Sequence, residues 1–300
     1  MRLSTPPDPS RLISALEPSM ITPRSQIAVL AIAAAGAAMS ACHTTPAASS
    51  GYLASYEGMA PPKRSLSAAN RQRRDDAASD AITAVYLEPA VFTPEVAAGL
   101  SPAERAMVLR EVERQICFEV SERFAIAPAP GPDHAVLRTA IVRLQPTGRI
   151  GSAASAAVGY FVPVINLRAP MTTGGLAIES ELLEAGSGRQ IAALSWARNA
   201  QYVGRDSPSL SRVGDAIQMA EPMGDAVGDA FASKARKVMD IPDPDPCAAY
   251  GPRRNIGRSA AGFVLSQATG LYSPEVAGVG ASAAVQNADA ASAPGEQPRP

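Results

Sequence analysis

The chain has 300 residues, of which 46% are hydrophobic, 18% charged and only 5% aromatic, so its length suits one folded domain with flexible ends. Its 27 Lys and Arg residues against 28 Asp and Glu residues give a net charge of -1, which excludes the strongly basic balance of a general nucleic-acid-binding protein. We therefore expect no nucleic-acid partner.

The N-terminal region carries a pattern typical of secretion. Residues 27–38 form an uncharged apolar run preceded by Arg24, which matches the positive and apolar regions of a secretory signal. The run is shorter than the roughly 20 residues that a membrane-spanning helix needs. Small residues then precede Cys42, and this arrangement resembles the lipobox of bacterial lipoproteins. The resemblance implies cleavage before Cys42 and acylation of its thiol, and His43 in the next position resembles an outer-membrane sorting signal.

We therefore expect residues 1–41 to be a lipoprotein signal peptide, with Met20 as the candidate true start because the residues before it fit no signal peptide. Two alternatives stay open, namely a secreted protein cut after Ala41 and a simple buried Cys42. If Cys42 carries lipid, Cys117 and Cys247 remain as an even pair in an oxidising periplasm. A single disulfide between them is possible, and the sequence leaves open whether it forms.

Residues 42–80 are rich in Ser, Ala, Pro and charge and show no sustained apolar period, so they are predicted to be a lipid-anchored flexible tether. This region contains a basic cluster that either lies against anionic headgroups or forms a solvated face, and the solvated face is the favoured interpretation. The cluster comprises Lys63, Arg64, Arg71, Arg73 and Arg74.

Residues 81–240 are predicted to form the folded domain. Residues 84–92 have the composition of a strand, which Pro89 restricts to an edge, an end or a bulge. A helix is expected to start at Ser101, because Ser101, Pro102 and Glu104 supply an N-cap, a first-turn proline and a capping-box acid. Its apolar stripe has helical spacing and comprises Leu109, Val112, Ile116, Val120 and Phe124.

Later elements follow the same reasoning. Residues 135–144 are predicted to be a strand, and residues 176–198 a β-hairpin that turns at residues 186–188. A helical stretch follows Pro208, with Pro222 either kinking or restarting it. The order predicts an α+β fold, a mainly antiparallel sheet of about four strands with two helices packed on one face. Residues 241–300 are predicted to be a largely disordered Ala/Pro/Gly-rich tail.

Three motifs resemble the Gram-negative lipoprotein family known as domain of unknown function three-three-one-three. That family has a "sGfLxdYs" start after the lipidated Cys and a hairpin with "DaxTGe" at its turn; this chain has Ser55, Glu184 and Ser187 in place of the usual Asp, Asp and Thr. The resemblance covers about residues 51–239 and implies no established activity. The motifs are Ser50-Gly51-Tyr52-Leu53 with Tyr56, Val85-Tyr86-Leu87-Glu88-Pro89, and Gly175-Leu176-Ala177-Ile178-Glu179 leading to Leu183-Glu184-Ala185 and Gly188.

The sequence offers little for catalysis. His43 and His134 sit in no recognisable motif, and His134 is more simply a solvated loop residue. Cys117 falls on the apolar side of its helix, which favours burial or a disulfide over a nucleophile. Two His without a ligand cluster cannot supply an ordinary zinc site, and no phosphate-binding loop is present, so we expect no metal, no cofactor and no enzyme activity.

Two further features have competing interpretations. Glu179 and Glu181 have strand spacing and are interpreted as the wet side of the hairpin rather than a carboxylate pair facing a cleft. Tyr160 and Phe161 could form an exposed apolar patch, but core packing is favoured.

The sequence thus predicts a noncatalytic lipoprotein of the outer membrane that faces the periplasm and acts as a structural or interaction module of the cell envelope. Its expected partners are membrane lipid, through acylated Cys42, and either an unknown envelope protein or a second copy of itself. The alternatives are a periplasmic ligand-binding protein or enzyme using a groove between helix and hairpin, and a hairpin edge that accepts a strand from another chain.

Overall fold

The computed structural model describes residues 44–65, 68–148, 166–167, 173–201, 203–204, 207–253 and 271–274. In chain order its elements are β1 (Lys63–Arg64), β2 (Ala69–Arg74), α2 (Asp76–Ala81), β3 (Ala84–Leu87), β4 (Val91–Phe92), α3 (Pro94–Ala98), α4 (Pro102–Ser121), β5 (Ala125–Ala127), β6 (Ala135–Gln145), β7 (Asn166–Leu167), β8 (Gly175–Leu183), β9 (Gln190–Asn199), β10 (Val203–Gly204), α6 (Gly214–Gln218), α7 (Ala220–Phe231) and a 3-10 turn at Ala248–Tyr250.

A mixed sheet of eight strands forms the centre of the described fold. Seven strands follow the order β1-β2-β9-β8-β6-β3-β5, and β4 pairs with β6 beside β3. The strands β2, β9, β8 and β6 pair antiparallel, whereas β3 runs parallel to both β5 and β6. A separate two-stranded pair joins β7 and β10.

The predicted fold, a mainly antiparallel sheet of about four strands with two helices, is therefore wrong. The sheet is larger and mixed, and the described residues contain five α-helices. The expected strand over residues 84–92 is split around Pro89, which lacks a ladder donor, into β3 and β4, and both lie parallel to β6. The short strand β5 has only three residues, too few for a recognisable period.

The helix α4, the longest among the described elements, begins as its sequence signals predict. Ser101 accepts a hydrogen bond from the backbone N–H of Glu104, whose side chain accepts one from the N–H of Ser101. This capping box and Pro102 in the first turn satisfy donors that a helix start otherwise leaves unpaired. The hairpin of β8 and β9 is also confirmed, with positive φ at Gly186 and Gly188 in its turn.

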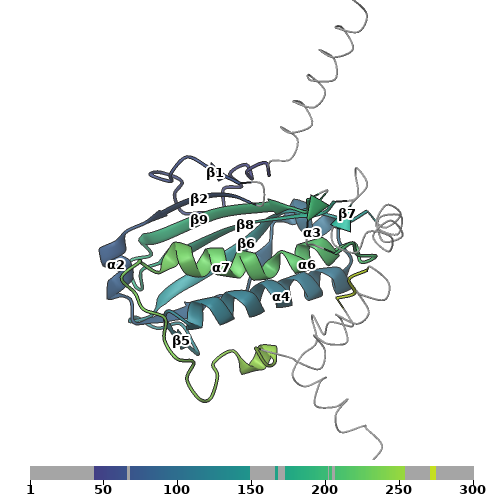
Figure 1. Ribbon diagram of the computed structural model, residues 1–300. Coiled ribbons are helices and arrows are strands. Elements are labelled where there is room, and N and C mark those ends of the chain that lie inside the picture. Colours follow the sequence, from purple (N-terminus) through teal and green to yellow (C-terminus); the bar gives the residue numbers. More distant parts are fainter. Residues whose placement is uncertain are drawn as a thin grey trace, which may run out of the picture. The chain divides into compact units, whose positions relative to one another are not determined.

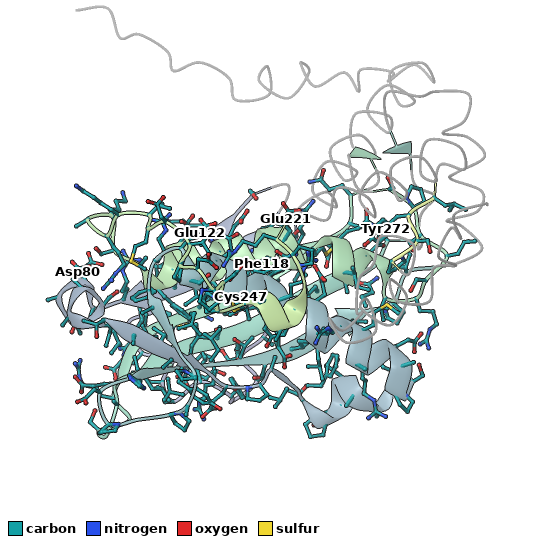
Figure 2. The ribbon with its side chains drawn as sticks, turned by 90° about the horizontal axis from the view of Figure 1, so that it is seen from below. Asp80, Phe118, Glu122, Glu221, Cys247 and Tyr272 are labelled. Atoms are coloured by element: carbon teal, nitrogen blue, oxygen red, sulfur yellow. A yellow bond between two sulfur atoms is a disulfide. The ribbon has the colours of Figure 1, made fainter. Side chains whose placement is uncertain are left out.

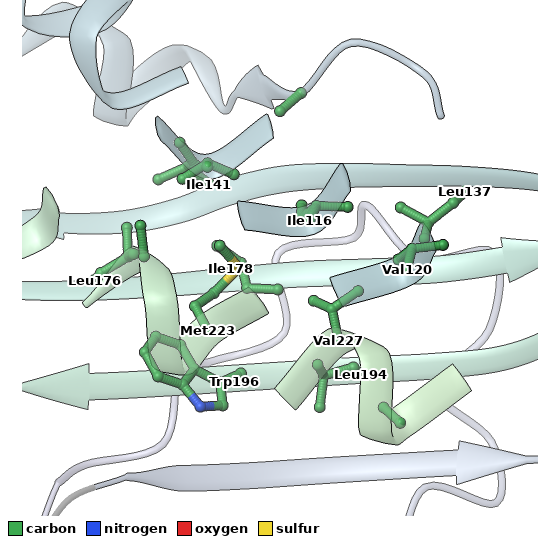
Figure 3. Packing of buried hydrophobic residues seen from close by; sticks show 14 of the residues in the cluster. Ile116, Val120, Leu137, Ile141, Leu176, Ile178, Leu194, Trp196, Met223 and Val227 are labelled. Atoms are coloured by element: carbon green, nitrogen blue, oxygen red, sulfur yellow. The ribbon is translucent and has the colours of Figure 1, made fainter. Parts of the chain in front are cut away.

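The helices α4 and α7 pack on one face of the sheet (Figure 1) and enclose the main core with it. Pro222 lies in the first turn of α7, so it restarts the helix after α6. Trp196 and Ile178 of the sheet meet Met223 and Val227 of α7 in this core (Figure 3). Buried apolar side chains of this size each contribute about 1.5–3 kcal/mol, so this layer supplies most of the hydrophobic stabilisation.

The opposite face of the sheet is covered by residues 44–60, which we call the strap. Strap residues Leu53 and Met59 pack around Ala193 of β9, and Ala47 packs against Ala177 and Ala197. The chain then enters β1 and β2, and β2 pairs with β9 over its whole length. The region predicted as a flexible tether thus supplies the strap and two strands. Its contacts are polar and long-range, so the sequence shows no apolar period from which these elements could be predicted.

The start of the predicted tail also packs on the fold. Cys247 is fully buried and lies against Cys117 and Phe118 of α4, as Figure 2 shows. Most of residues 241–300 lies outside the described residues, apart from residues 241–253 and 271–274.

Candidate functional site

The strap closes over two glutamates of β8, and this cluster is the most concentrated polar arrangement we identify. Successive side chains of a strand point to opposite faces, so Ala177, Glu179 and Glu181 share the face away from the helices. Small residues at Ala193 and Ala197 of the neighbouring strand leave room for the strap backbone to approach. The strap therefore forms a layer over this face and buries the carboxylates of Glu179 and Glu181.

Glu179 accepts hydrogen bonds mainly from hydroxyl groups. The Ser50 hydroxyl donates to its Oε2 at 2.5 Å and the Tyr56 hydroxyl donates to the same oxygen at 2.6 Å. The Ser50 N–H donates to Oε1 at 3.3 Å. Gly51, with a φ of 86° that favours glycine, turns the strap so that its N–H donates to the Tyr56 hydroxyl at 2.8 Å.

Glu181 is compensated by a cation. Arg138 of β6 donates through Nε to Oε1 at 2.6 Å, and Gln190 donates to Oε2 at 2.5 Å. The backbone N–H of Ala54 donates to Oε2 at 2.9 Å. The guanidinium of Arg138 also lies over the Tyr52 ring, 5.1 Å from its centroid, and donates to the Tyr52 carbonyl. Both oxygens of this carboxylate therefore have donors, as a buried charge requires.

Burial also changes the acidity of the strap tyrosines. It raises the pKa of Tyr52 to about 12, although the nearby Arg138 charge acts in the opposite direction. Burial, followed by the hydrogen bond to Glu179, raises the pKa of Tyr56. Both phenols therefore keep their protons at neutral pH, and Tyr56 stays a donor to Glu179.

The interpretation of Glu179 and Glu181 as the wet side of the hairpin is wrong, because both residues are 0% exposed. The period-two pattern assigns them to the face away from the helices but does not say whether that face is covered. The cover comes from residues more than 120 positions earlier in the chain. Protein donors occupy the carboxylates of both glutamates, and the Tyr56 hydroxyl is bonded to Glu179, which suits holding the strap rather than activating a substrate.

The other candidate residues lie elsewhere. Cys42, His43, Tyr160 and Phe161 lie outside the described residues. His134 sits in the loop before β6, with Nδ1 3.3 Å from the Ala129 carbonyl oxygen.

Cys117 and Cys247, which the sequence left as a possible pair, are joined by a disulfide in the structure. Two arginines support this junction. Arg253 donates to both carboxylate oxygens of Asp245 and to the Ser121 hydroxyl, and Arg110 stacks over the Tyr250 ring, 5.3 Å from its centroid. The junction thus fixes residues 245–253 on α4.

Two arginines of the basic cluster make contacts inside the fold. Arg73 donates to the carbonyls of Glu57 and Gln190, and Arg74 pairs with Asp76 and donates to the carbonyls at the end of α7. A pocket of about 270 Å³ lies along β1 and β2, lined by Ala60, Pro61, Lys63, Asn70, Gln72, Arg73, Arg74 and Asp76. Its arginines donate to backbone carbonyls of the strap, of β9 and of α7, so both side chains are held in place by the fold.

Across the described ranges, no group of three or more His, Cys, Asp or Glu side chains is arranged to hold a metal ion. Within the same ranges, no helix has the length and apolarity needed to cross a membrane.

The sequence missed Arg138 and Gln190, because strand patterning does not reveal which cross-strand neighbours a covered carboxylate needs. The family motifs did contain a signal for the Glu179 contacts. Two of the motifs include Ser50, Tyr56 and Glu179, and these three residues are hydrogen-bonded in the structure.

Comparison with known proteins places this architecture in a family. A family model described as "Protein of unknown function (DUF3313)" matches residues 48–227, which confirms the resemblance seen in the motifs. The match includes residues 48–60 of the strap and both glutamates of the network, and it ends within α7. A search of curated proteins finds no match.

Two solved structures of the PelC dodecamer from Paraburkholderia phytofirmans are similar to the chain. One has 11% sequence identity and a TM-score of 0.34, covering 56% of this chain and 99% of the PelC chain. The other, a variant, has 12% identity and a TM-score of 0.32, covering 56% of this chain and 98% of the PelC chain.

Proposed function

This chain belongs to the DUF3313 family, and we propose that it is an outer-membrane lipoprotein, anchored by acylated Cys42 and facing the periplasm, that acts as a noncatalytic structural or interaction module of the cell envelope. Its partners under this proposal are membrane lipid and either an envelope protein or a second copy of the chain.

One observation carries the proposal: polar residues of the family motifs are bonded to each other. Ser50, Tyr56 and Glu179 form one closed set, and Glu181 is held by Arg138, Gln190 and the strap backbone. A catalytic group must be free to reach a substrate, whereas these groups fasten the N-terminal segment to the sheet. This use of the motif supports a role in presenting the folded domain from an anchored N-terminus.

The alternative of a ligand carrier or enzyme working between helix and hairpin lacks an observation in its favour. In the described residues, the space between α7 and the sheet is filled by core side chains such as Trp196, Met223 and Leu194 (Figure 3).

The proposal is tested by intact mass and membrane fractionation of the native protein beside Cys42→Ala. We expect the wild-type chain to begin at Cys42, to carry about three acyl chains and to sediment with outer membranes, and the variant to be soluble or retained as precursor. A wild-type chain that starts elsewhere without lipid would overturn the anchored role.

The noncatalytic part of the proposal needs its own test. Purified protein can be screened for hydrolysis and ligand binding beside Glu179→Gln, with folding checked by circular dichroism. Turnover that disappears in a folded Glu179→Gln variant would contradict the proposed role.

A further inference from the structure

The chain is attached to the sheet at Thr44, two positions after Cys42 in the sequence. Thr44 is 3% exposed, and its hydroxyl oxygen accepts a hydrogen bond from the N–H of Asn199 at 3.4 Å. The carbonyl of Thr45 accepts one from Arg143 at 3.2 Å, and Ala47 is buried against the sheet. The strap is thus fixed to the sheet from its first described residue.

This attachment limits how far a lipid on Cys42 can be from the fold. Two residues of extended chain span at most about 7 Å. A flexible tether would need many more residues to let the domain move freely above a membrane. Acylation of Cys42 would therefore bring Thr44 and its neighbours to the headgroup layer.

The structure also defines which end of the sheet would face the lipid. Gln145, Gly175 and Asn199 form a row across β6, β8 and β9, and Thr44 lies beside Asn199. The hairpin turn at Gly186–Gly188 is at the other end of the same strands. Strand β9 has 10 residues, so the two ends are about 30 Å apart.

The end near Thr44 has chemistry suited to an anionic lipid surface. Among the described contacts, Arg143 donates to two neutral oxygens, those of Thr45 and the Asn199 side chain. Leu210 is 47% exposed, and it lies near the end of β6 because Thr147 donates to the carbonyl of Arg212. A cation and an exposed apolar side chain together are typical of residues that contact headgroups.

The other end of the fold carries charges of both signs, including exposed Lys234 and Lys237 after α7 and Arg189 in the hairpin turn. The start of α4 is tied to Arg212 through Glu104, so the carboxyl end of this helix of 20 residues lies about 30 Å away. Glu119 and Glu122 lie at that carboxyl end, and Asp229 pairs there with Arg123. Because both signs are present there, the far end favours neither orientation, and the orientation is set by the short connection between Cys42 and Thr44 and by Arg143.

We propose that the sheet end beside Thr44, where Arg143, Asn199 and Leu210 lie, faces anionic phospholipid headgroups, with strands β6, β8 and β9 rising from the membrane surface. This inference rests on the proposed lipid anchor, and it adds a fixed orientation and a membrane-contacting surface. The hairpin turn and the carboxyl ends of α4 and α7 then face away from the membrane, where a partner can reach them.

The orientation can be measured with fluorescent labels on the acylated full-length protein. Gln145→Cys and Ser187→Cys are exposed positions at the near and far ends, and the native disulfide leaves the introduced thiol as the one to label. The protein is reconstituted into vesicles of phosphatidylethanolamine and phosphatidylglycerol with a small fraction of headgroup-quencher lipid. We expect at least threefold stronger quenching at position 145 than at position 187.

A matched variant separates orientation from anchoring. Insertion of ten Gly and Ser residues between His43 and Thr44 keeps the lipidation site but lengthens the connection, so the difference in quenching should fall below twofold. Equal quenching at positions 145 and 187 in the acylated protein without the insertion would overturn the inference. The intact mass of the same sample shows whether Cys42 is acylated, so failure of the anchor is distinguished from failure of the orientation.

Discussion

Glu179 and Glu181 are two buried carboxylates on one strand whose charges are stabilised differently. Hydroxyl and backbone donors serve Glu179, whereas Glu181 has a guanidinium within hydrogen-bond distance. Removing one partner of a buried ion pair leaves an uncompensated charge, which costs more than the pair itself contributes. Arg138 is therefore the side chain in this network on which stability depends most.

We expect Arg138→Met to lower the free energy of unfolding by about 3 kcal/mol, because Glu181 would keep its buried position without its cation. Urea unfolding followed by circular dichroism measures the change. Arg189→Met is the matched control, since Arg189 pairs with Glu184 on the exposed turn, where water screens the pair, and its loss should change stability far less. Equal effects of the two variants would show that the strap network is not a buried ion-pair site.

Glu119 makes the stability of the protein depend on pH. Burial, followed by the charges of Asp225, Glu122, Asp229 and Glu221, raises its pKa from 4.5 to about 7. The folded state then holds a proton that the unfolded state releases, so this carboxyl reduces stability as pH rises from about 4.5 to about 7.

Glu119→Gln imitates the protonated carboxyl, so we expect it to stabilise the protein at pH 8 and to have little effect near pH 4. The gain should stay below about 1 kcal/mol because the side chain is partly exposed. Thermal unfolding at the two pH values measures it, and Glu57→Gln on the exposed part of the strap is the control. A gain that is the same at both pH values would contradict this assignment.

At the scale of elements, α4 and α7 approach closely because α7 has glycines on the contact face. A Cβ at Gly224 would lie 2.9 Å from the carbonyl oxygen of Gln115, and one at Gly228 would lie 3.3 Å from the Glu119 Cβ. Backbone atoms cannot move aside as a flexible side chain can. The short distance between α4 and α7 therefore requires a residue without a side chain at position 224.

Gly224→Ala should destabilise the protein by about 1–3 kcal/mol, because overpacking outweighs the roughly 1 kcal/mol by which alanine favours a helix. Gly228→Ala should cost clearly less, since its nearest contact is a longer one to a side chain. Differential scanning calorimetry of the two variants compares the midpoints. A more stable Gly224→Ala protein would mean that the helices can separate without loss.

The disulfide connects α4 to the segment after α7 across 130 residues of sequence. Cross-links over long loops restrict the unfolded chain, and natural ones typically contribute about 2–4 kcal/mol. The double variant Cys117→Ala and Cys247→Ala should lose stability in that range and become cleavable by trypsin near Arg253. Urea unfolding and timed proteolysis report the two effects, and unchanged proteolysis would show that the arginine contacts alone hold the segment.

Elements with local signals were predictable, and those with long-range partners were not. The capping box at Ser101 and the glycine-rich turn at residues 186–188 act within a few residues, so the sequence displays them directly. Strand β2 consists mostly of charged and amide residues, which do not predict a strand. It nevertheless pairs with β9 through backbone hydrogen bonds, and these leave no pattern in the sequence. Pro89 was expected to restrict its strand to an edge, an end or a bulge, but the division into β3 and β4 and their parallel pairing with β6 were not predicted.

At the scale of the whole molecule, the candidate site depends on the strap, whose position over the sheet no local sequence pattern predicts. The Ser50 hydroxyl and its acceptor Glu179 are separated by 129 positions, and Tyr56 and Glu179 by 123. Alternation correctly placed the two glutamates away from the core face, and two of the family motifs contained Glu179 and its hydroxyl donors Ser50 and Tyr56. Only the assembled sheet shows that these motifs lie on each other.

The contacts of the strap with the sheet make residues 44–57 part of the folded unit. Two chains that both lack Cys42 test this statement. A chain starting at Thr44 keeps all of the strap and should unfold cooperatively, with the stability of the mature protein. A chain starting at Gly58 lacks the donors of Ser50, Ala54 and Tyr56, and each lost bond to a buried carboxylate costs about 1–3 kcal/mol. We expect it to lose about 4 kcal/mol or more, or to show no cooperative transition in urea. If both chains unfold at the same urea concentration, residues 44–57 are a dispensable tether, and the domain is free to move above its anchor.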